Sequence, residues 1–154
     1  MQFGIFYEHQ LPKPWTDDDE FCLLRNALDQ VELADRLGFD HAWEVEHHFL
    51  DEYSHSSAPE VFLAAAAART SNIRLGHGIR QVIPNYNHPA RTAEGLATLD
   101  LISNGRLRGC FGRWNRGIVT GWPRWNGHLL GRDLPKRDRL IVQPTSTRWQ
   151  CWFR

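Results

Sequence analysis

The spacing of four short apolar segments constrains the fold of this chain more than any other feature. Residues 2–7, 39–45, 73–83 and 106–111 are each strand-like, and their starts follow one another at intervals of about 35 residues. Each interval leaves room for one helix. Strands that alternate regularly with helices are typical of βαβ units, so the sequence predicts an α/β fold with a parallel sheet.

The segments between these strands carry helix signals. Residues 16–20 provide an N-cap and an acidic first turn, and they precede an apolar repeat at helical spacing that Gly38 ends. Pro59 opens an alanine-rich helix, and Pro89 opens a third helix, which Gly105 closes. The sequence therefore predicts one helix in each interval between strands.

Polar residues follow each predicted strand, where a parallel α/β fold gathers the carboxyl ends of its strands into one rim. Glu46 and His47 come directly after the second strand. A neighbouring carboxylate can fix the tautomer of an imidazole, so His47 is the strongest catalytic candidate. Glu46 either takes part in the chemistry or pairs with an arginine in the mouth of the fold. The candidate rim residues are Glu8, His9, Glu46, His47, His48, His77, Gly78, Gly112 and Arg113.

Two glycines flank His77 near the end of the third apolar segment. Gly76 and Gly78 interrupt the strand pattern there and permit a flat ligand to approach the backbone closely. A metal site built from the rim histidines is the weaker alternative. Adjacent residues such as His47 and His48 point in opposite directions at a strand end and rarely share one metal, so we predict no metal.

Charge is divided unevenly along the chain, although the formal net charge is zero. Residues 1–107 contain 8 basic and 16 acidic residues, whereas residues 108–154 contain 10 basic and 2 acidic residues. Residues 114–154 also hold five of the seven tryptophans and lack a helical period, and only residues 140–142 resemble a strand. We therefore expect a β/α domain over residues 1–113, followed by an irregular tail rich in Arg and Trp.

Two hypotheses account for this tail. Arg, Gly, Pro and Trp without periodicity are typical of GC-rich coding DNA read out of frame, which predicts a frame-shifted segment. Alternatively, Arg and Trp form a basic arm that contacts phosphates and stacks on bases. Because the basic residues are scattered and share no helix or strand face, nucleic acid is the less favoured partner.

The composition favours a cytoplasmic protein with no membrane partner. The first residues lack the basic segment and long apolar run of a signal peptide, and no stretch reaches the roughly 18 apolar residues of a membrane span. Cys22, Cys110 and Cys151 are too few and too widely spaced to indicate a disulfide framework or a zinc site.

Several segments occur in an order and spacing that is specific over about 105 residues. They are Met1-Gln2-Phe3-Gly4-Ile5-Phe6, Leu37-Gly38-Phe39-Asp40, Glu46-His47-His48-Phe49, Ser57-Ala58-Pro59, Arg69-Thr70, Ile73-Arg74-Leu75-Gly76, His88-Pro89-Ala90-Arg91-Thr92-Ala93-Glu94 and Leu99-Asp100-Leu101-Ile102-Ser103-Asn104-Gly105-Arg106. Together they make the first 113 residues resemble the bacterial-luciferase-like family of flavin-dependent monooxygenases.

The resemblance implies the N-terminal half of a (β/α)8 TIM barrel, truncated in this chain, with reduced FMN in the mouth of the barrel. Molecular oxygen and an aldehyde or another small organic substrate would react there, and a flavin reductase would supply the reduced flavin. Some members of the family use a reduced deazaflavin instead. We expect the chain alone to be weakly active or inactive. The alternative is a non-catalytic partner subunit in a homo- or heterodimer.

The resemblance also implies roles for individual residues. His47 matches the active-site histidine that assists proton transfer, and Glu46 beside it is the second catalytic candidate. Gly78 and Ile79 match a strand end, often with a non-proline cis peptide bond, that supports the isoalloxazine ring. Arg113 falls where some members contact the flavin phosphate. The predicted cofactor-binding residues are Gly78, Ile79, Tyr7 and Arg113, and we expect Gly78 and Tyr7 to line the bowl at whose mouth His47 lies.

Overall fold

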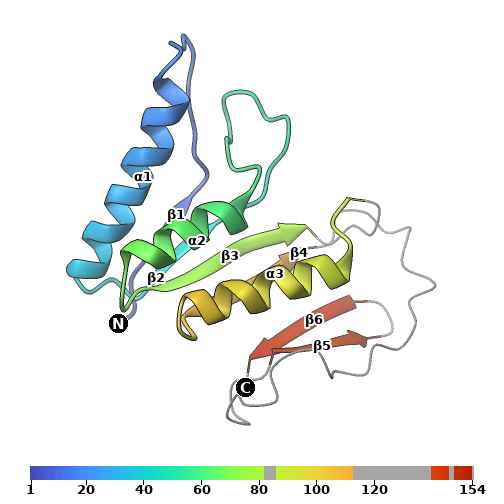
Figure 1. Ribbon diagram of the computed structural model, residues 1–154. Helices are drawn as coiled ribbons and strands as arrows, with labels where there is room; N and C mark the ends of the chain where they lie inside the picture. Colours follow the sequence, from blue (N-terminus) through green and yellow to red (C-terminus); the bar gives the residue numbers. More distant parts are fainter. Residues whose placement is uncertain (82–85, 113–139, 146–147, 154) are drawn as a thin grey trace.

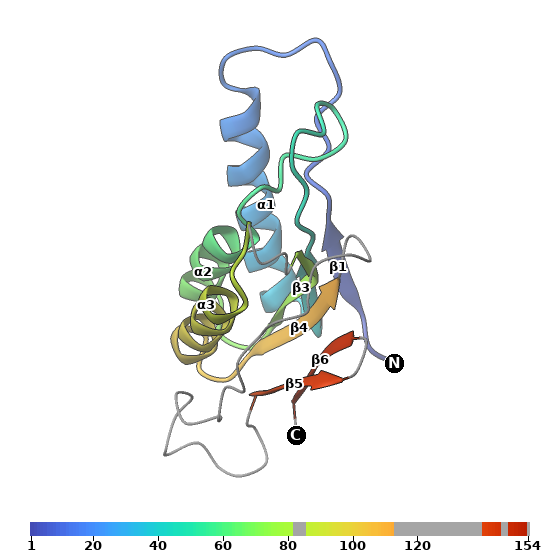
Figure 2. The same cartoon turned by 90° about the vertical axis from the view of Figure 1, so that its right-hand side faces the viewer.

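Four parallel strands form one sheet, and helices cover one of its faces (Figures 1 and 2). The computed structural model describes residues 1–81, 86–112, 140–145 and 148–153. The strand order is β1-β2-β3-β4, so each strand lies beside its successor, and the predicted α/β fold is confirmed. The strands are β1 (Gly4–Tyr7), β2 (His41–Glu44), β3 (Arg74–Gln81) and β4 (Leu107–Gly112), and the helices are α1 (Asp19–Arg36), α2 (Pro59–Arg69) and α3 (Pro89–Ile102).

The parallel register sets which residues meet at the rim. Tyr7 is paired with Glu44, and Glu44 is paired with His77 on the next strand. The residues that follow Tyr7 and Glu44 therefore leave the sheet at the same level. This alignment confirms the expected rim at the carboxyl ends of the strands.

The hydrophobic core lies between the sheet and its helices. Val31 from α1 and Leu63 from α2 are at most 1% exposed and belong to the same apolar cluster as Leu75 and Leu107 from the strands. Burying a side chain of this kind contributes about 1.5–3 kcal/mol. The alanines of α2 are small enough to let this helix approach the sheet closely. The core therefore holds the helices to one face, and within the described residues no helix covers the other face.

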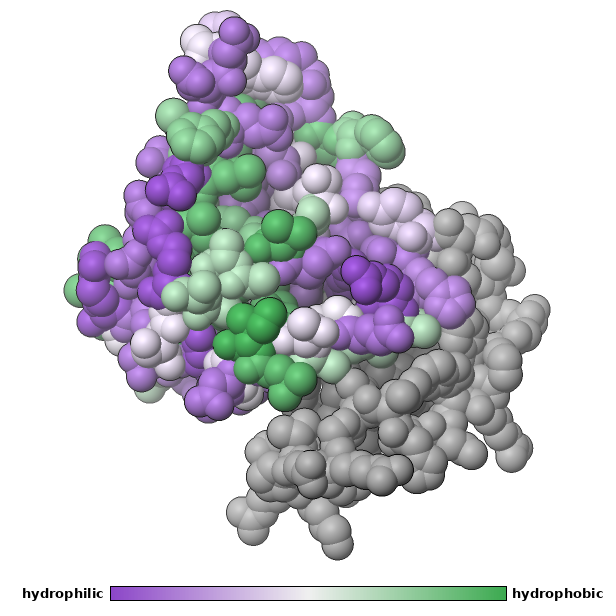
Figure 3. Space-filling model, in the orientation of Figure 1, coloured by the Kyte–Doolittle hydropathy of each residue, from purple (hydrophilic) through white to green (hydrophobic). Residues whose placement is uncertain are grey.

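The outer side of the helices is mixed in polarity. Figure 3 shows apolar patches among polar side chains over the helical layer. Val61 of α2 and Leu101 and Ile102 of α3 are large apolar residues that are more than half exposed. These helices are therefore apolar on more than their sheet-facing side.

Two helix ends match their predicted chemistry. Gly38 follows α1 with a φ of 80°, and Gly105 follows α3 with a φ of 78°, a conformation that glycine adopts without strain. At the start of α1 the N-cap residue Asp18 makes no side-chain cap hydrogen bond. Instead, the backbone N–H of Thr16, before the helix, donates to the carboxylate of Asp19, the first residue of the helix, at 2.6 Å. In the predicted cap, a side chain before the helix would accept a backbone N–H from within it.

The predicted break in the third strand is wrong. β3 runs without interruption through Gly76 and Gly78, and only its pairing with β4 shifts between His77 and Arg80. The physical reason lies on the neighbouring strand. A Cβ atom at position 76 would collide with the ring of Trp43, so this glycine makes room for an aromatic side chain and does not end the strand.

Asp35 fastens the end of α1 to the turn before β3. Its carboxylate accepts backbone N–H groups from Ser71 at 2.8 Å, Asn72 at 2.9 Å and Ile73 at 2.6 Å. Burial opposes ionisation, but these three donors outweigh it and lower the pKa of Asp35 from 3.8. The ionised carboxylate therefore stabilises this junction.

Asp35→Asn is expected to destabilise the fold at neutral pH by about 1 kcal/mol, because the charge that strengthens three hydrogen bonds is lost. A depressed pKa gives stability that is present above the unfolded-state value of 3.8 and is lost as the pH falls through the folded-state value. The difference between parent and variant should therefore shrink on acidification in urea unfolding curves. Asp40→Asn is the control with one amide donor, from Phe3, and its effect should be smaller. Equal effects would contradict the account.

A separate antiparallel hairpin lies in the segment that we predicted to be irregular. It consists of β5 (Leu140–Thr145) and β6 (Arg148–Phe153), and β6 lies beside β4 (Figures 1 and 2). The expected strand at residues 140–142 is confirmed, whereas β6 was not predicted. The boundary at residue 113 and the frame-shift hypothesis stay predictions, since residues 113–139 lie outside the described part of the chain.

Within the described ranges, no helix combines the length and the apolar character needed to cross a lipid bilayer.

Candidate active site

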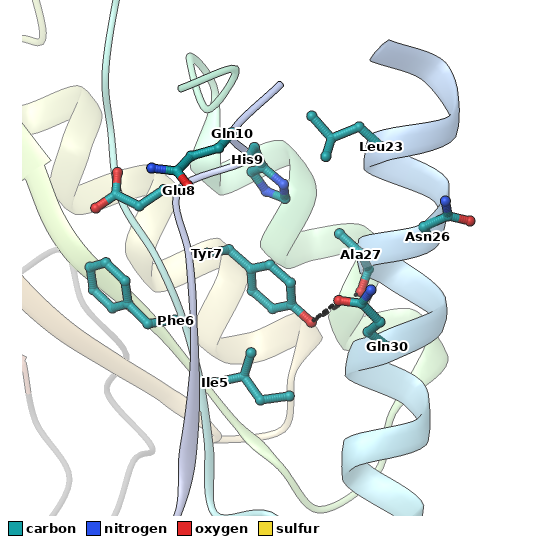
Figure 4. A pocket seen from close by; sticks show the side chains of 10 residues that line it. All are labelled: Ile5, Phe6, Tyr7, Glu8, His9, Gln10, Leu23, Asn26, Ala27 and Gln30. Atoms are coloured by element: carbon teal, nitrogen blue, oxygen red, sulfur yellow. Dashed lines mark hydrogen bonds between the residues drawn. The ribbon is translucent and has the colours of Figure 1, made fainter. Parts of the chain in front are cut away.

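The two faces of β1 separate the candidate site from the helical core. Figure 4 shows Phe6 and Glu8 on one side of this strand, and Ile5 and Tyr7 on the other side, toward α1. We call the side of the sheet that faces away from the helices the inner face. Phe6 is 56% exposed there, whereas Tyr7 is buried. Phe6, near the carboxyl end of β1, is therefore accessible to a ligand on the inner face.

His47 and Glu8 form a pair at this rim. His47 Nε2 lies 3.3 Å from Glu8 Oε2, and the two side chains are 31% and 24% exposed. The ring of Tyr53 lies edge-on to the imidazole, with 5.6 Å between the ring centres. The backbone N–H of His47 donates to the carbonyl of Ser56 at 2.9 Å. A carboxylate therefore lies beside His47 at the rim, as we expected, but it belongs to Glu8 and not to Glu46.

Glu46 lies in a different, buried environment. Its carboxylate accepts the Gln81 backbone N–H and the Asn87 side-chain amide, each at 2.9 Å, and lies 3.2 Å from an Arg80 nitrogen and 3.1 Å from His48 Nε2. The side chain is 1% exposed. These contacts fit the alternative in which Glu46 pairs with an arginine. A catalytic role for Glu46 stays a prediction, and the geometry gives this residue a structural task.

Phe6 and Gly78 form an apolar floor on the inner face. A Cβ atom at Gly78 would lie 2.8 Å from Phe6 Cε2, so the missing side chain lets the Phe6 ring lie against the backbone of β3. Ile79 is 46% exposed. The expected cis peptide bond is not found at this position, since the bond between Gly78 and Ile79 is trans.

Tyr7 does not line this floor, contrary to the prediction. Its hydroxyl lies 3.4 Å from the Ala27 carbonyl and from Gln30 Oε1, both on α1 (Figure 4). Burial, with a smaller contribution from Glu44, raises the pKa of Tyr7 to about 12. Because side chains alternate along a strand, Phe6 takes the position beside Gly78 that we assigned to Tyr7. Arg113, the remaining predicted cofactor residue, lies outside the described residues.

Two hollows border the rim. One, of about 400 Å³, contains His47 and is lined by Trp15, Glu20, His47, Phe49, Leu50, Asp51, Ser54, His55 and Ser57. The other, of about 470 Å³, opens between β1 and α1 (Figure 4) and lies mostly on the helical side of the strand. We take the first as part of the site because it reaches His47. Phe49 at its edge has a φ of 58°, a strained backbone conformation for a bulky residue.

In the part of the chain that the structure describes, no cluster of three or more His, Cys, Asp or Glu side chains is arranged to hold a metal ion.

A family model described as "Luciferase-like monooxygenase" matches residues 1–140, which is most of the chain and extends beyond the predicted boundary at residue 113. The chain belongs to this family.

Three relatives show how this luciferase-like chain compares with known proteins. Limonene 1,2-monooxygenase from Rhodococcus erythropolis is 42% identical over 109 residues, which are 70% of this chain and 26% of the relative. The oxygenating constituent of 3,6-diketocamphane monooxygenase from Pseudomonas putida, solved in complex with FMN, is 25% identical with a TM-score of 0.63, covering 73% of this chain and 29% of that one. The coenzyme F420-dependent tetrahydromethanopterin reductase from Methanopyrus kandleri is 32% identical with a TM-score of 0.51, covering 76% and 27%.

The luciferase-like chain thus spans only about a quarter of the length of the limonene monooxygenase. Its four parallel strands and three helices match part of the larger folds of the solved relatives. The family assignment rests on this shared part.

A buried cluster lies beneath the rim of this luciferase-like fold, and of its members only His9 was predicted as a rim residue, where we expected it to be accessible. Glu44, on β2, lies with Oε1 3.2 Å from His9 Nε2 and 2.7 Å from the Ser56 hydroxyl oxygen. All three residues are at most 4% exposed. Glu44 sits in a run of mostly apolar residues, and Ser56 lies a few residues before the helix that Pro59 opens. Their proximity depends on tertiary structure, which no local pattern encodes.

Proposed function

We propose that this chain provides the cofactor-facing floor and the His47–Glu8 pair of a flavin-dependent monooxygenase that uses reduced FMN and molecular oxygen on an aldehyde or another small organic substrate. One observation carries the proposal. A partly exposed imidazole and a carboxylate lie 3.3 Å apart at the rim of an accessible apolar face. This arrangement combines a group able to hold a proton with a surface suited to a flat ring.

The residues present fit the ring portion of a flavin. Phe6 and Ile79 expose apolar surface, and the Phe6 ring, which packs against the backbone at Gly78, offers an aromatic face to a flat ring. The phosphate contact expected at Arg113 lies beyond the described residues, so the fit concerns the ring alone. When bound, reduced FMN supplies the electrons for the activation of oxygen.

The chain's own groups have separate tasks at such a site. His47 holds or transfers a proton at Nε2, and the carboxylate of Glu8 lies 3.3 Å from this atom. The amide hydrogen bond from His47 to Ser56 fixes where the imidazole leaves the backbone. The hollow of about 400 Å³ beside His47 gives an organic substrate access to the same imidazole.

The relatives support the choice of partners. One solved relative is an oxygenating constituent in complex with FMN, which favours FMN for this chain and a separate flavin reductase as the source of reduced flavin. Another relative depends on coenzyme F420, which supports a reduced deazaflavin as the alternative cofactor. Titration with each cofactor distinguishes the two.

We expect weak cofactor binding and little turnover from the chain alone, because it spans about a quarter to two fifths of the length of its monooxygenase relatives. A non-catalytic partner subunit, in a homo- or heterodimer, stays the alternative. The nucleic-acid hypothesis concerns a tail that lies mostly outside the described residues, and it also stays a prediction.

His47→Ala is expected to lower the affinity for FMN about three- to tenfold, because one polar contact at the rim is lost. The fold should be nearly as stable as that of the parent, since the side chain is 31% exposed. Flavin fluorescence during titration with the chain measures the affinity, and urea unfolding measures the stability.

The matched control for this experiment is His41→Ala. His41 is the first residue of β2, the strand that leads to His47, and it pairs with Gly4 of β1. It therefore lies at the amino end of the strand, away from the rim. It should leave the FMN affinity unchanged. If both variants weaken FMN binding equally, or if neither does, the assignment of His47 to the flavin site fails.

A further inference from the structure

We propose that the buried residues Glu44, Ser56 and His9 act together as positioning residues that hold the His47–Glu8 pair in place, and that Glu44 does so as a neutral carboxylic acid. This inference rests on the proposed function only for the role of His47 itself. The positioning is a property of the fold and can be measured without flavin.

The first step of the argument is that the cluster is joined directly to both members of the pair. Ser56 accepts the backbone N–H of His47 at 2.9 Å through its carbonyl. His9 follows Glu8 in the chain, and its carbonyl accepts the backbone N–H of His55 at 3.0 Å. The segment 55–56 therefore bridges the end of β1 and the end of β2. A shift of Ser56 would move His47 away from Glu8.

The second step concerns the hydroxyl of Ser56, which has two acceptors but only one proton. Its oxygen lies 2.6 Å from the Val45 carbonyl and 2.7 Å from Glu44 Oε1. A hydroxyl donates one hydrogen bond at a time. If Glu44 were ionised, one of these short contacts would join two acceptors. A protonated Glu44 removes the conflict, since it donates to Ser56 and Ser56 donates to Val45.

The third step concerns the surroundings of Glu44, which favour the neutral acid. The carboxyl group is 2% exposed, and its Oε2 atom has no hydrogen-bond partner. Burial raises the pKa of Glu44, with Glu60 adding to the increase, while His9 and Ser56 oppose it. Tyr7 and His77, the strand neighbours of Glu44, are also buried. A buried oxygen without a donor costs less free energy in a neutral acid than in a carboxylate.

The test measures amide hydrogen exchange by NMR at His47 and His55 in the full chain. Ser56→Ala is expected to speed exchange at both amides about tenfold, because the hydroxyl that joins Glu44 to Val45 is lost. Ser103→Ala is the matched control. Ser103 is likewise fully buried, and its hydroxyl donates to the carbonyl of Asp100, but it lies at the opposite end of the sheet. This control should leave both amides at the parent rate.

The role of the neutral acid is tested by pH. After correction for intrinsic exchange, the parent should lose protection at His47 as rising pH ionises Glu44, whereas Glu44→Gln should stay protected because its amide is a permanent neutral donor. Difference infrared spectra of the parent should show the carbonyl band of a protonated carboxyl group that Glu44→Gln lacks.

Unchanged exchange in Ser56→Ala would overturn the proposal, as would identical pH profiles for the parent and Glu44→Gln. If Ser56→Ala fails to fold, the Glu44→Gln comparison still decides the matter. A positive exchange result in a chain that does not bind FMN would refute the proposed function alone, so the two failures are distinguishable.

Discussion

Lowering the pH from about 6.5 to 4 is expected to destabilise the fold by about 3 kcal/mol through His77 alone, since each unit of pH is worth about 1.36 kcal/mol for a group of this kind. His77 on β3 is 0% exposed, and both of its ring nitrogens lack a hydrogen-bond partner. Burial, reinforced by the charge of Arg80, lowers the pKa of His77 from 6.5 to about 3.

The direction of this effect follows from the two protonation states. Between these pKa values the unfolded chain carries a protonated imidazole, whereas the folded chain must keep His77 neutral. The unfolded state therefore binds more protons, and stability falls as the pH falls. Glu44 acts in the opposite direction because its pKa is raised, and Asp35 contributes only below its unfolded value of 3.8.

His77→Leu separates this effect from the others. The variant removes the titrating group and both unpaired nitrogens, so its stability should vary much less between pH 6.5 and 4 than that of the parent. Urea unfolding at several pH values measures the difference, and the value at pH 8 serves as the internal reference. Parallel curves for parent and variant would show that His77 is not the source of the acid sensitivity.

Glu46→Ala is expected to destabilise the chain by about 3–5 kcal/mol, because it removes one partner of a buried ion pair. Arg80, which is 8% exposed, would keep only Glu60 as its charged partner, and the Gln81 amide and the Asn87 side chain would lose their acceptor. Gln81 at the end of β3 and Asn87 would both lose their hydrogen bonds to the segment that follows β2. Chemical unfolding followed by circular dichroism measures the loss.

Glu60→Ala is the matched control for this prediction. Glu60 pairs with the same arginine at 2.6 Å, but its side chain is 40% exposed, so the loss should be no more than about 1 kcal/mol. If Glu46→Ala were as stable as the parent, the structural role given to Glu46 would be wrong, and its predicted catalytic role would become the better explanation of its position.

The order of the elements could be predicted because each is marked by local chemistry. Gly38 and Gly105 end helices with a positive φ, and Pro59 and Pro89 open them. Each of these residues determines the conformation of its own backbone, so its effect can be predicted from the residue type alone. The resemblance to the luciferase-like family rests on the same segments and is confirmed.

The face of the sheet to which each side chain points could not be predicted in the same way. Residues 4–7 are Gly, Ile, Phe and Tyr, so nothing in the run separates the helix-facing side from the inner face. Assigning Tyr7 to the mouth was therefore as consistent with the sequence as assigning Phe6. The structure decides for Phe6, because Tyr7 packs toward α1 and Phe6 lies against Gly78.

The partners of the polar rim residues were also hidden from the sequence. Glu46 is the neighbour of His47 in the chain, but after the end of β2 the two side chains reach different partners, Arg80 for Glu46 and Glu8 for His47. The carboxylate that reaches His47 comes from Glu8, almost forty residues earlier. Contacts of this kind depend on the register of β1 on β2, which the sequence does not display.

The hairpin of β5 and β6 shows a different limit. Pro144 lies within β5, and proline is uncommon inside strands, so the pattern there supported only residues 140–142. The sequence of β6 mixes tryptophan with charged and polar residues and has no clear alternation. The two segments form strands by pairing with each other, although neither has a clear strand pattern of its own.

The most direct test of the central claim is an NMR titration of the full chain with FMN, which detects weak binding and locates it. We predict that the amide signals of Phe6, Glu8, His47 and Gly78 shift together, while those of Val61 and Leu101 on the outer side of the helices stay in place. Shifts confined to the helices, or no shifts at millimolar FMN, would contradict the assignment of the inner face and its His47–Glu8 pair to the flavin.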